Sequence, residues 1–420
     1  MQRSPKAEST VKLELGSGPS TQPVDIPDRN LLGIIEPERH EPFHEIETAL
    51  RRAAEETASF LGPARRVLVL VNDRTRPTPS GLILSSLASV LRQRAVRVLV
   101  CLGAHRPAVP AELDLILGPE MRSLSDLNVV QHDCRSVSSL FLMGRTTKGT
   151  EVRMNREILW AERIIAVNSV EPHYFAGFTG GRKSFLPGIA GIDGIVQNHN
   201  LAVHTAAMPL ALEGNPVHAD MVEAAQMVPR PIFSIQTVQD RDLRLLSVRS
   251  GSLQDSFNQA CADARRSYGL TVGHKADIVL SVVRPPGDIN LYQSQRAVEF
   301  AQSVLNSPSV HITVSSCREG IGDDGFIRTL LKFRDPNEIL SQPNGFDYSG
   351  WHKAVRLVRI RQRTDLYAVT GLDPDVIRSA VMTPFATVQE AIDAAISHIG
   401  PDARVYVIPD AAAVVPIYAG

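Results

Sequence analysis

The chain has 420 residues, of which 43% are hydrophobic and 21% are charged. This length is long for a single core, and the apolar fraction can fill two cores of ordinary size, which argues against disorder over most of the chain. The formal net charge is −1 at pH 7. Bulk charge therefore gives no reason to expect a nucleic acid or a membrane surface as a partner.

Cysteine content and the N-terminal sequence indicate the compartment. The four cysteines stand far apart, without the paired spacing of zinc knuckles or CxxC redox motifs. The first ten residues, MQRSPKAEST, lack the apolar core of a signal peptide, and no apolar run is long enough to span a bilayer. These features predict a cytoplasmic protein. The cysteines are Cys101, Cys134, Cys261 and Cys317.

The spacing of apolar residues predicts the first elements. Residues 11–15 alternate with period two and end at Gly16, which predicts a strand that enters a turn. Residues 49–62 have the spacing of an amphipathic helix that closes at Gly62, and residues 67–71 predict a fully buried strand. Helix and buried strand then recur at residues 82–91 and 96–102.

Further buried strands are predicted at residues 129–130, 164–167, 278–283, 310–314, 366–370 and 405–408. Apolar strands that alternate with helices predict an α/β fold with mainly parallel sheets covered on both faces. Residues 267–275 have no strong periodicity and lie between a predicted helix and a fresh strand. We therefore predict two α/β domains, residues 1–270 and residues 271–420.

Two arginine-containing loops follow predicted strands of the first domain. Open parallel sheets bind ligands in the loops after the carboxyl ends of their strands. Residues 72–77 and 103–107 lie in such loops, and residues 71–110 contain six arginines but one acidic residue, Asp73. Arginines at these positions suit a carboxylate or a phosphate, although solvated loop arginines would give the same pattern. His105, in the loop sequence GAHRP, is a candidate catalyst or a surface residue.

The segment after the strand at 164–167 is rich in glycine, with six glycines from Gly177 to Gly194. Glycines let a backbone approach a ligand closely and present amide donors to anions. Residues 177–184 differ at one position from the phosphate-binding P-loop pattern, with Arg182 where the last glycine belongs. A phosphotransferase that uses this loop is therefore one alternative.

Three reactive side chains lie in or beside the glycine-rich segment. His173, Lys183 and His199 together offer a general base, an amine nucleophile and a metal ligand. His199 could instead simply cap a helix, a role that His204 would serve equally well.

In the second domain, the strand at 278–283 leads to a helix that opens near residues 291–296. Polar groups at a helix start can hold an anion with help from the helix dipole. Gln293 and Arg296 are the candidates, unless they are merely exposed first-turn residues.

Five motifs occur in order along the chain: DRTRP at 73–77, GAHRP at 103–107, EPHYFAGFTGGRKSFLPGIAG at 171–191, NHN at 198–200 and YQS at 292–294. Together they resemble the nickel-pincer nucleotide-dependent lactate racemase family, and the stretch from 171 to 200 is long enough to be highly specific. The resemblance implies two α/β domains with the active site in the cleft between them, the N-terminal domain binding the cofactor and the C-terminal domain contributing substrate-binding residues.

The resemblance also implies the reaction and the cofactor. The expected enzyme is an isomerase, a racemase or epimerase that inverts the 2-position of a small 2-hydroxy carboxylate by reversible hydride transfer. The expected cofactor is nickel pyridinium-3,5-bisthiocarboxylic acid mononucleotide, supplied by cofactor-biosynthesis proteins. Loss of hydride from C2 leaves a stable 2-keto acid, whereas the adjacent carboxylate disfavours a carbanion. The hydroxyl points to opposite sides in the two enantiomers, so two bases are needed.

The resemblance assigns roles to individual residues. Lys183 matches the lysine that tethers the cofactor through a thioamide, and His199 matches the histidine that ligates nickel. His105 and His173 match the two catalytic histidines on opposite faces of the substrate. The nucleotide-binding loop corresponds to Asp73, Arg74, Thr75 and Arg76, and the substrate-binding residues correspond to Arg76, Tyr292, Gln293, Arg296 and Trp351.

One position departs from the family. The family's lactate enzyme has a lysine three positions after the substrate-binding glutamine, and this chain has Arg296. An arginine still binds a carboxylate, but its planar fork is larger and differently placed than an ammonium group. The substrate therefore stays open among lactate, malate, an aromatic lactate and a sugar acid. A cofactor carrier without turnover is the non-enzymatic alternative.

Overall fold

The computed structural model describes residues 9–17, 21–37, 45–76, 78–342 and 350–420. The chain divides into two units, which we describe separately. The N-terminal unit is Arg39–Ser267, and the C-terminal unit combines Met1–Glu38 with Tyr268–Gly420. Pro77, the last residue of the first arginine motif, lies outside the described residues.

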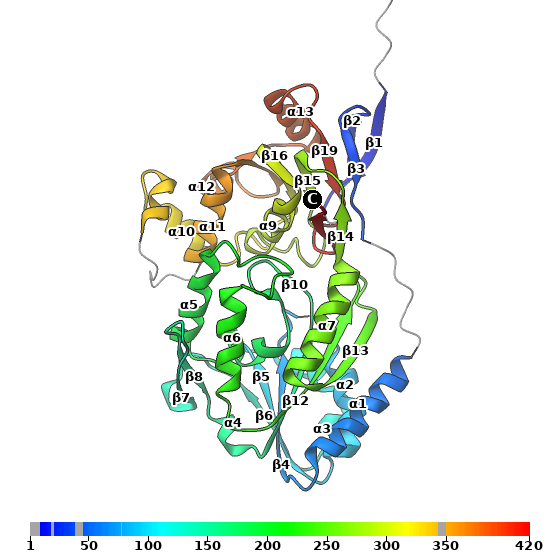
Figure 1. The fold of residues 1–420 in the computed structure, drawn as a ribbon, viewed down its shortest axis with the longest axis vertical. Helices are drawn as coiled ribbons and strands as arrows, with labels where there is room; N and C mark the ends of the chain where they lie inside the picture. The colour runs from blue at the N-terminus through cyan, green and yellow to red at the C-terminus, as the bar shows by residue number, and fades with distance from the viewer. Residues whose placement is uncertain (1–8, 18–20, 38–44, 77, 343–349) are drawn as a thin grey trace, which may run out of the picture. The chain divides into compact units, whose positions relative to one another are not determined.

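The N-terminal unit is built on one six-stranded sheet (Figure 1). Five of its strands, β12 to β6 in spatial order, are parallel, and β13 pairs antiparallel to β12 at one edge. In spatial order the strands are β13 (Leu245–Ser252), β12 (Ile232–Gln239), β9 (Arg163–Ser169), β4 (Arg66–Asn72), β5 (Ala95–Cys101) and β6 (Leu127–Gln131).

Side chains on both faces of this sheet are buried, as expected for a parallel sheet covered by helices. Along β4, Val67, Val69 and Val71 face the core under α1, α2 and α3. Leu68 and Leu70 face the other core, which α5, α6 and the glycine-rich segment complete. The helices are α1 (Ile46–Leu61), α2 (Ser80–Leu91), α3 (Pro110–Arg122), α4 (Glu157–Trp160), α5 (Ile192–Asn200), α6 (Pro216–Gln226) and α7 (Leu253–Tyr268).

Two small hairpins complete this unit, β7 (Leu140–Arg145) with β8 (Glu151–Asn155), and β10 (Pro172–His173) with β11 (Gly177–Phe178). Three 3₁₀ turns lie at Val137–Ser139, Gly181–Ser184 and Leu201–Val203.

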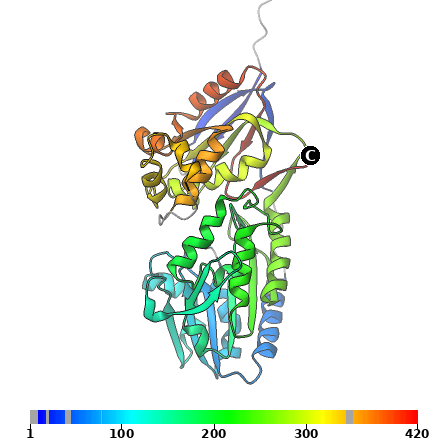
Figure 2. The same ribbon diagram turned by 60° about the vertical axis from the view of Figure 1, so that its left-hand side comes forward.

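The C-terminal unit also has a six-stranded sheet, and all its pairings are parallel (Figure 2). One face packs on α13 and on the β1–β2 hairpin, and the other packs on α9. In spatial order the strands are β18 (Thr383–Pro384), β17 (Thr364–Thr370), β16 (Leu305–Ser315), β15 (Ala276–Val282), β19 (Val405–Ile408) and β3 (Leu31–Ile34).

The remaining elements of this unit are short strands and helices. The strand pairs are β1 (Thr10–Leu15) with β2 (Gln22–Pro27), and β14 (Gly269–Val272) with β20 (Val415–Tyr418). The helices are α8 (Leu291–Ser294), α9 (Arg296–Ala301), α10 (Gly325–Leu330), α11 (Trp351–Arg361), α12 (Pro374–Ser379) and α13 (Val388–Ile399), with 3₁₀ turns at Gln302–Val304 and Pro336–Ser341.

The predicted α/β class with mainly parallel sheets is confirmed, and all the buried strands predicted from the sequence are present with small differences at their ends. The strand β12 was not predicted. Its residues Ser234, Gln236 and Thr237 interrupt the apolar pattern, yet all three are buried because their side chains form hydrogen bonds inside the unit. None of the helices in the described ranges has the length and apolar character needed to cross a membrane.

The predicted domain ranges need one correction. The expected boundary between residues 270 and 271 lies near the observed one after Ser267. However, residues 9–17 and 21–37 do not belong with the N-terminal unit as predicted. Strand β3 pairs with β19, and the buried Val24 and Ile26 of β2 pack in the core of the C-terminal unit. A pairing across this sequence separation leaves no local pattern from which it could be predicted.

Asn30 fixes this early segment to the C-terminal unit. The side chain is fully buried, and its Nδ2 donates to the carbonyl oxygens of Pro401 and Ala403 at 2.8 Å each. We expect Asn30→Ala to lower the free energy of unfolding by about 2 kcal/mol, because two buried carbonyls lose a donor. Hydrogen exchange should become faster in β3 and β19. The exposed Asn128, in β6, is a control that should change neither, and unaltered exchange in β19 after Asn30→Ala would contradict this role.

Candidate active site

Three loops of the N-terminal unit meet at one edge of its sheet. Strands β9, β4 and β5 are neighbours and run parallel, so their carboxyl ends lie together. Asp73 follows β4, His105 follows β5, and the glycine-rich segment follows β9. The strand order therefore brings together loops whose residues are far apart in the chain, such as Asp73 and Lys183.

His105 forms a close pair with Asp73. The His105 Nδ1 and an Asp73 carboxylate oxygen are 2.6 Å apart, and the Thr75 hydroxyl donates to the other carboxylate oxygen at 2.6 Å. Burial by itself raises the pKa of the Asp73 carboxyl. The hydrogen bond and charge of His105, with the help of Thr75 and Arg76, outweigh burial and lower the pKa below its ordinary value. Asp73 is therefore ionised at neutral pH and holds His105 with Nδ1 toward the carboxylate, leaving Nε2 for chemistry.

The other arginines of these loops have different partners. Arg106 donates to both carboxylate oxygens of Glu112 at 2.7 and 3.0 Å, and Arg74 Nε lies 3.1 Å from the same carboxylate. The hydrogen bond from Arg106, followed by the Val109 backbone amide, lowers the pKa of Glu112 to about 2. Asp73 and Thr75 thus contact His105, and Arg74 contacts Glu112. A nucleotide-binding role for this loop stays a prediction.

The glycine-rich segment is organised around Arg182. This side chain is 2% exposed, its guanidinium lies 4.4 Å from the centroid of the Phe257 ring, and it donates to the carbonyl oxygens of Ala176, Thr179 and Gly180. A P-loop directs backbone amides at a phosphate and continues into a helix. Here carbonyls converge on an arginine, and residues 181–184 form one 3₁₀ turn.

The loop therefore lacks the geometry of the P-loop alternative, because carbonyl oxygens converge on Arg182 and residues 181–184 form a 3₁₀ turn. The expectation that the glycines open the backbone to a ligand is also corrected at two of them. A Cβ on Gly177 would lie 2.1 Å from the Ala211 carbonyl oxygen, and a Cβ on Gly181 would lie 2.7 Å from the Phe257 ring. These glycines permit close packing of the loop against the protein.

A buried polar network fixes the loop to the sheet. Asn168, at the end of β9, exchanges hydrogen bonds with Ser184 at 2.8 and 3.0 Å and donates to Asn72 of β4 at 3.1 Å. Gln236 of β12 accepts a hydrogen bond from the Gly181 amide at 3.2 Å. The sequence analysis missed these positioning residues. The signal was present as polar residues at the ends of apolar strands, but nothing in the sequence indicated which of them would meet.

Lys183 projects from this loop toward His173. Its Nζ lies 3.4 Å from His173 Nε2 and 5.5 Å from the centroid of the Phe175 ring. Burial, and then the charges of Arg76 and Arg182, lower the pKa of Lys183 well below its ordinary value. Its amine is consequently a better nucleophile at neutral pH than that of an exposed lysine.

The local backbone orients the His173 ring. Its Nδ1 lies 3.5 and 3.3 Å from the backbone amide nitrogens of Phe175 and Ala176, long contacts that orient the ring without assigning its tautomer, and its Nε2 faces Lys183. The ring also packs edge-on against Phe175, with centroids 4.5 Å apart. The His173 ring is thus fixed in place, with Nε2 beside the amine of Lys183.

His199, in the last turn of α5, packs on the same phenylalanine. The ring centroids of His199 and Phe175 are 5.2 Å apart. Burial, and then the charge of Lys183, lower the pKa of His199 to about 3, while a hydrogen bond with the Ile195 backbone opposes the shift. His199 is therefore a neutral imidazole, the form that binds metals. The alternative residue, His204, is exposed and accepts a hydrogen bond from the Ala206 amide, so it serves the local turn.

Electrostatic effects connect the two halves of the cluster. The charge of His105 contributes to the lowered pKa of His199, and the charge of Arg76 contributes to the shifts at both Asp73 and Lys183. Among the described residues, no three His, Cys, Asp or Glu side chains lie close enough to hold a metal ion by themselves. A metal at His199 would need most of its ligands from another molecule.

The predicted substrate residues of the C-terminal unit lie at the start of α8 and α9. The Asn290 side chain caps α8 by accepting from the Gln293 amide at 2.9 Å, and Arg296 Nη2 donates to Gln293 Oε1 at 2.8 Å. The Ser294 hydroxyl lies 2.7 Å from that of Ser315, which ends β16, so this segment lies at the carboxyl edge of the sheet.

Two other residues adjoin this segment. Lys353 donates to the Tyr292 carbonyl and lies over the Tyr292 ring, 3.5 Å from its centroid. Trp351, which begins α11, is 2% exposed, and its indole Nε1 has no hydrogen-bond partner within the described ranges. Its predicted contact with substrate stays a prediction.

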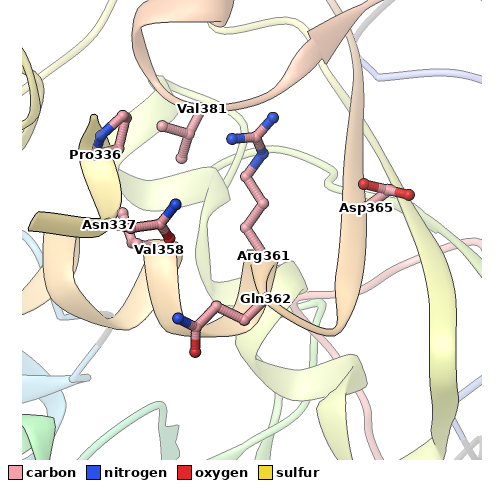
Figure 3. A pocket seen from close by; sticks show the side chains of 7 residues that line it. All are labelled: Pro336, Asn337, Val358, Arg361, Gln362, Asp365 and Val381. Carbon is pink, nitrogen blue, oxygen red and sulfur yellow. The ribbon is translucent and has the colours of Figure 1, made fainter. Parts of the chain in front are cut away.

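A surface hollow of the same unit lies elsewhere (Figure 3). Its lining includes Arg361, Gln362 and Asp365, and Asp365 is the second residue of β17. The hollow is thus at the amino edge of the sheet, whereas Gln293 is at the carboxyl edge. It contains none of the predicted site residues.

The fold and this cluster define an α/β protein with a lysine of lowered pKa and neighbouring histidines at the carboxyl edge of a parallel sheet. Residues 17–209 match the lactate racemase N-terminal domain, and residues 272–416 match the lactate racemase C-terminal domain. The lactate racemase of Lactiplantibacillus plantarum is 31% identical over 83% of this chain and 84% of its own. That of Thermoanaerobacterium thermosaccharolyticum is 28% identical over 96% of this chain and 99% of its own.

The lactate racemase apoprotein structure from Thermoanaerobacterium thermosaccharolyticum superposes with a TM-score of 0.87, at 27% identity over 97% of this chain and 100% of that one. The chain belongs to the lactate racemase family, as the sequence motifs indicated. It is accordingly an enzyme of the isomerase class.

The lowered pKa of Lys183 can be tested without any cofactor. We expect Lys183 to react with acetic anhydride at a lower pH than the exposed Lys148, because a lowered pKa leaves the amine uncharged below the ordinary value of about 10.4. Competitive acetylation from about pH 6 to pH 10, followed by peptide mass spectrometry, gives the pH of half-reactivity for each lysine. The exposed Lys148 is the internal control. Equal half-reactivity for Lys148 and Lys183 would rule out the shift.

Proposed function

We propose that the chain is a racemase or epimerase that inverts the 2-position of a lactate-like 2-hydroxy carboxylate, with a nickel-pincer nucleotide bound covalently to Lys183. The observation that supports this best is the group of Lys183, His173 and His199 around Phe175. It combines an amine of lowered pKa, a fixed base and a neutral imidazole in one place.

The side chains present fit such a cofactor. Formation of a thioamide needs an uncharged amine, and burial with two nearby arginines lowers the pKa of Lys183 accordingly. A single neutral imidazole, His199, suits a metal whose other ligands come from the organic part of the cofactor. Arg76, whose charge acts on both Lys183 and Asp73, would hold an anionic group of cofactor or substrate.

When bound, this cofactor would supply an acceptor for hydride from C2 of the substrate. The protein's part is to move the hydroxyl proton. His105 Nε2 and His173 Nε2 would each serve one enantiomer as base and the other as acid, because the hydroxyl points to opposite sides in the two forms. Asp73 would stabilise the imidazolium that forms when His105 takes a proton, since its carboxylate is already 2.6 Å from Nδ1.

Substrate recognition would fall to polar and aromatic side chains. Arg76 and Arg296 are guanidinium groups suited to a carboxylate, and Gln293 is held by Arg296 with its amide nitrogen available as a donor. Tyr292 and Trp351 would contribute aromatic surface. Biosynthesis proteins would deliver the cofactor.

His199 and Lys183 should have separable effects on cofactor loading. After co-expression with the cofactor-biosynthesis proteins, Lys183→Ala should lack the covalent adduct, whereas His199→Ala should keep the adduct mass and lose nickel. Intact-protein mass spectrometry and elemental analysis measure the two quantities. His204→Ala is the matched control and should keep both. An adduct that persists in Lys183→Ala, or full nickel in His199→Ala, would be incompatible with the assigned roles.

His105→Ala and His173→Ala should each slow racemisation by about 10²–10⁴-fold, the usual cost of losing a general base. The rates in both directions should fall, because each histidine acts as a base on one enantiomer and as an acid in forming the other. Initial rates from each pure enantiomer, followed by chiral chromatography with cofactor-loaded enzyme, provide the test. A near-normal rate in either variant would exclude a two-base mechanism, and a wild-type chain that binds the cofactor but racemises no 2-hydroxy acid would be a carrier.

A further inference from the structure

The helix that carries His199 is fastened to its neighbour by the preceding residue. Helices α5 and α6 lie side by side (Figure 1). Asn198 is fully buried, and its Nδ2 donates to the Asp220 carboxylate at 2.7 Å and to the Val217 carbonyl oxygen at 3.3 Å. Asp220 and Val217 both belong to α6. One side chain thus holds the last turn of α5 against α6.

Asp220 joins three segments in the interior of the N-terminal unit. Its carboxylate is fully buried, and besides Asn198 it accepts hydrogen bonds from the hydroxyls of Thr146 and Thr150, the latter at 2.9 Å. The two threonines lie in the turn between β7 and β8. A buried carboxylate is costly unless hydrogen bonds satisfy it. Three neutral donors among the described residues do so here, and they tie Asn198 to this turn as well as to α6.

The same helix holds the phenylalanine on which His199 packs. Asn215 is fully buried and is the N-cap of α6, where its Oδ1 accepts from two backbone amides of the first turn. Its Nδ2 donates to the Phe175 carbonyl oxygen at 2.8 Å. Asn215 therefore fastens Phe175 to the start of α6, while Asp220 fastens the last turn of α5 to the middle of α6.

The position of the His199 ring depends on both attachments. The ring forms a hydrogen bond with the backbone of Ile195, one turn earlier in the same helix, so it follows any movement of α5. Its centroid lies 5.2 Å from that of the Phe175 ring. A metal-binding imidazole needs a fixed orientation, which the groups around it supply. Here α6 holds both the helix of the ring and the side chain on which the ring packs.

We propose that Asp220 and Asn215 are positioning residues for the metal site. Asp220 acts through Asn198 on the helix of the metal ligand. Asn215 acts through Phe175 on the surface against which the ring of His199 packs. This inference rests on the proposed function and adds the residues that hold its metal ligand. Because no three His, Cys, Asp or Glu side chains of the described ranges gather at one place, the orientation of this one ring decides how well a metal is held.

The first test needs no cofactor and uses the full chain. Diethyl pyrocarbonate modifies accessible histidine rings, and peptide mass spectrometry gives the rate for each histidine. We expect Asn198→Ala and Asn215→Ser to raise the rate at His199 at least about fivefold, because loss of a buried hydrogen bond favours opened states by about that factor. Asn215→Ser keeps an oxygen that can cap α6. The exposed His204 is the internal reference and should react equally in every variant.

The second test measures nickel per covalent adduct after co-expression with the cofactor-biosynthesis proteins, by elemental analysis and intact-protein mass spectrometry. Asn198→Ala should keep the adduct and bind nickel about 10–100-fold more weakly in competition with a chelator, the usual cost of losing a group that orients a metal ligand. Asn198→Asp places a carboxylate against Asp220 and should lose nickel at least as readily. Adding Asp220→Asn to Asn198→Asp restores a donor and an acceptor across the same contact, so this double variant should regain nickel.

The matched control is Ile83→Ala, which leaves a cavity in the core on the opposite face of the sheet. It destabilises the unit but leaves the hydrogen bonds of α5 and α6 in place. The modification rate of His199 and the nickel per adduct should therefore stay as in the wild type. If the two quantities merely followed the stability of the fold, Ile83→Ala would change them as well, and the positioning role would be wrong.

An unchanged rate at His199 in folded Asn198→Ala protein would overturn the positioning role, with or without cofactor. Full nickel in Asn198→Ala, or a folded double variant that fails to regain nickel, would overturn this inference alone if the wild-type chain carries both adduct and nickel. A wild-type chain that takes up no adduct would overturn the proposed function, and the modification rates would still decide whether α6 fixes His199.

Discussion

The parallel order of β9, β4 and β5 is the constraint on which the rest of the N-terminal unit depends. Neighbouring parallel strands end at the same edge, so the loops after them must share that edge. The Asp73–His105 pair comes from two of these loops, and Lys183 comes from the third. With another strand order these loops would lie apart, and their charges would have little effect on the pKa values of one another's side chains.

Positive charge is used in two different ways around this edge. Arg182 has a structural role, because its guanidinium donates hydrogen bonds to three loop carbonyls and lies over the Phe257 ring. Its charge nevertheless acts at the neighbouring Lys183, where it adds to burial and to Arg76 in lowering the pKa of the amine. The same residue that fixes the loop thus favours the uncharged form of the Lys183 amine. In the C-terminal unit, Arg296 has the corresponding effect on the pKa of Lys353.

Local sequence patterns predicted the elements that are locally determined. Buried strands such as β4 and the helix that closes at Gly62 have apolar spacings that require no distant partner. Pairings between distant segments could not be predicted in this way, as the place of β3 beside β19 demonstrates. The polar strand β12 was missed because its buried Gln236 is explained only by the loop that it contacts. Motifs indicated the family and the residues to expect in its site, whereas the contact between Lys183 and His173, and the burial of Arg182, could be seen only in the fold.

The central claim is that this edge supports transfer of hydride at C2 while two histidines move the hydroxyl proton. The most direct test follows the hydrogen on carbon. Cofactor-loaded enzyme would act in ordinary water on one enantiomer of an accepted 2-hydroxy acid labelled with deuterium at C2, and mass spectrometry of the inverted product would locate the label. Hydride transfer within a closed site predicts that deuterium is retained at C2. Its replacement by hydrogen from the solvent would show that carbon loses a proton instead, and would contradict the account.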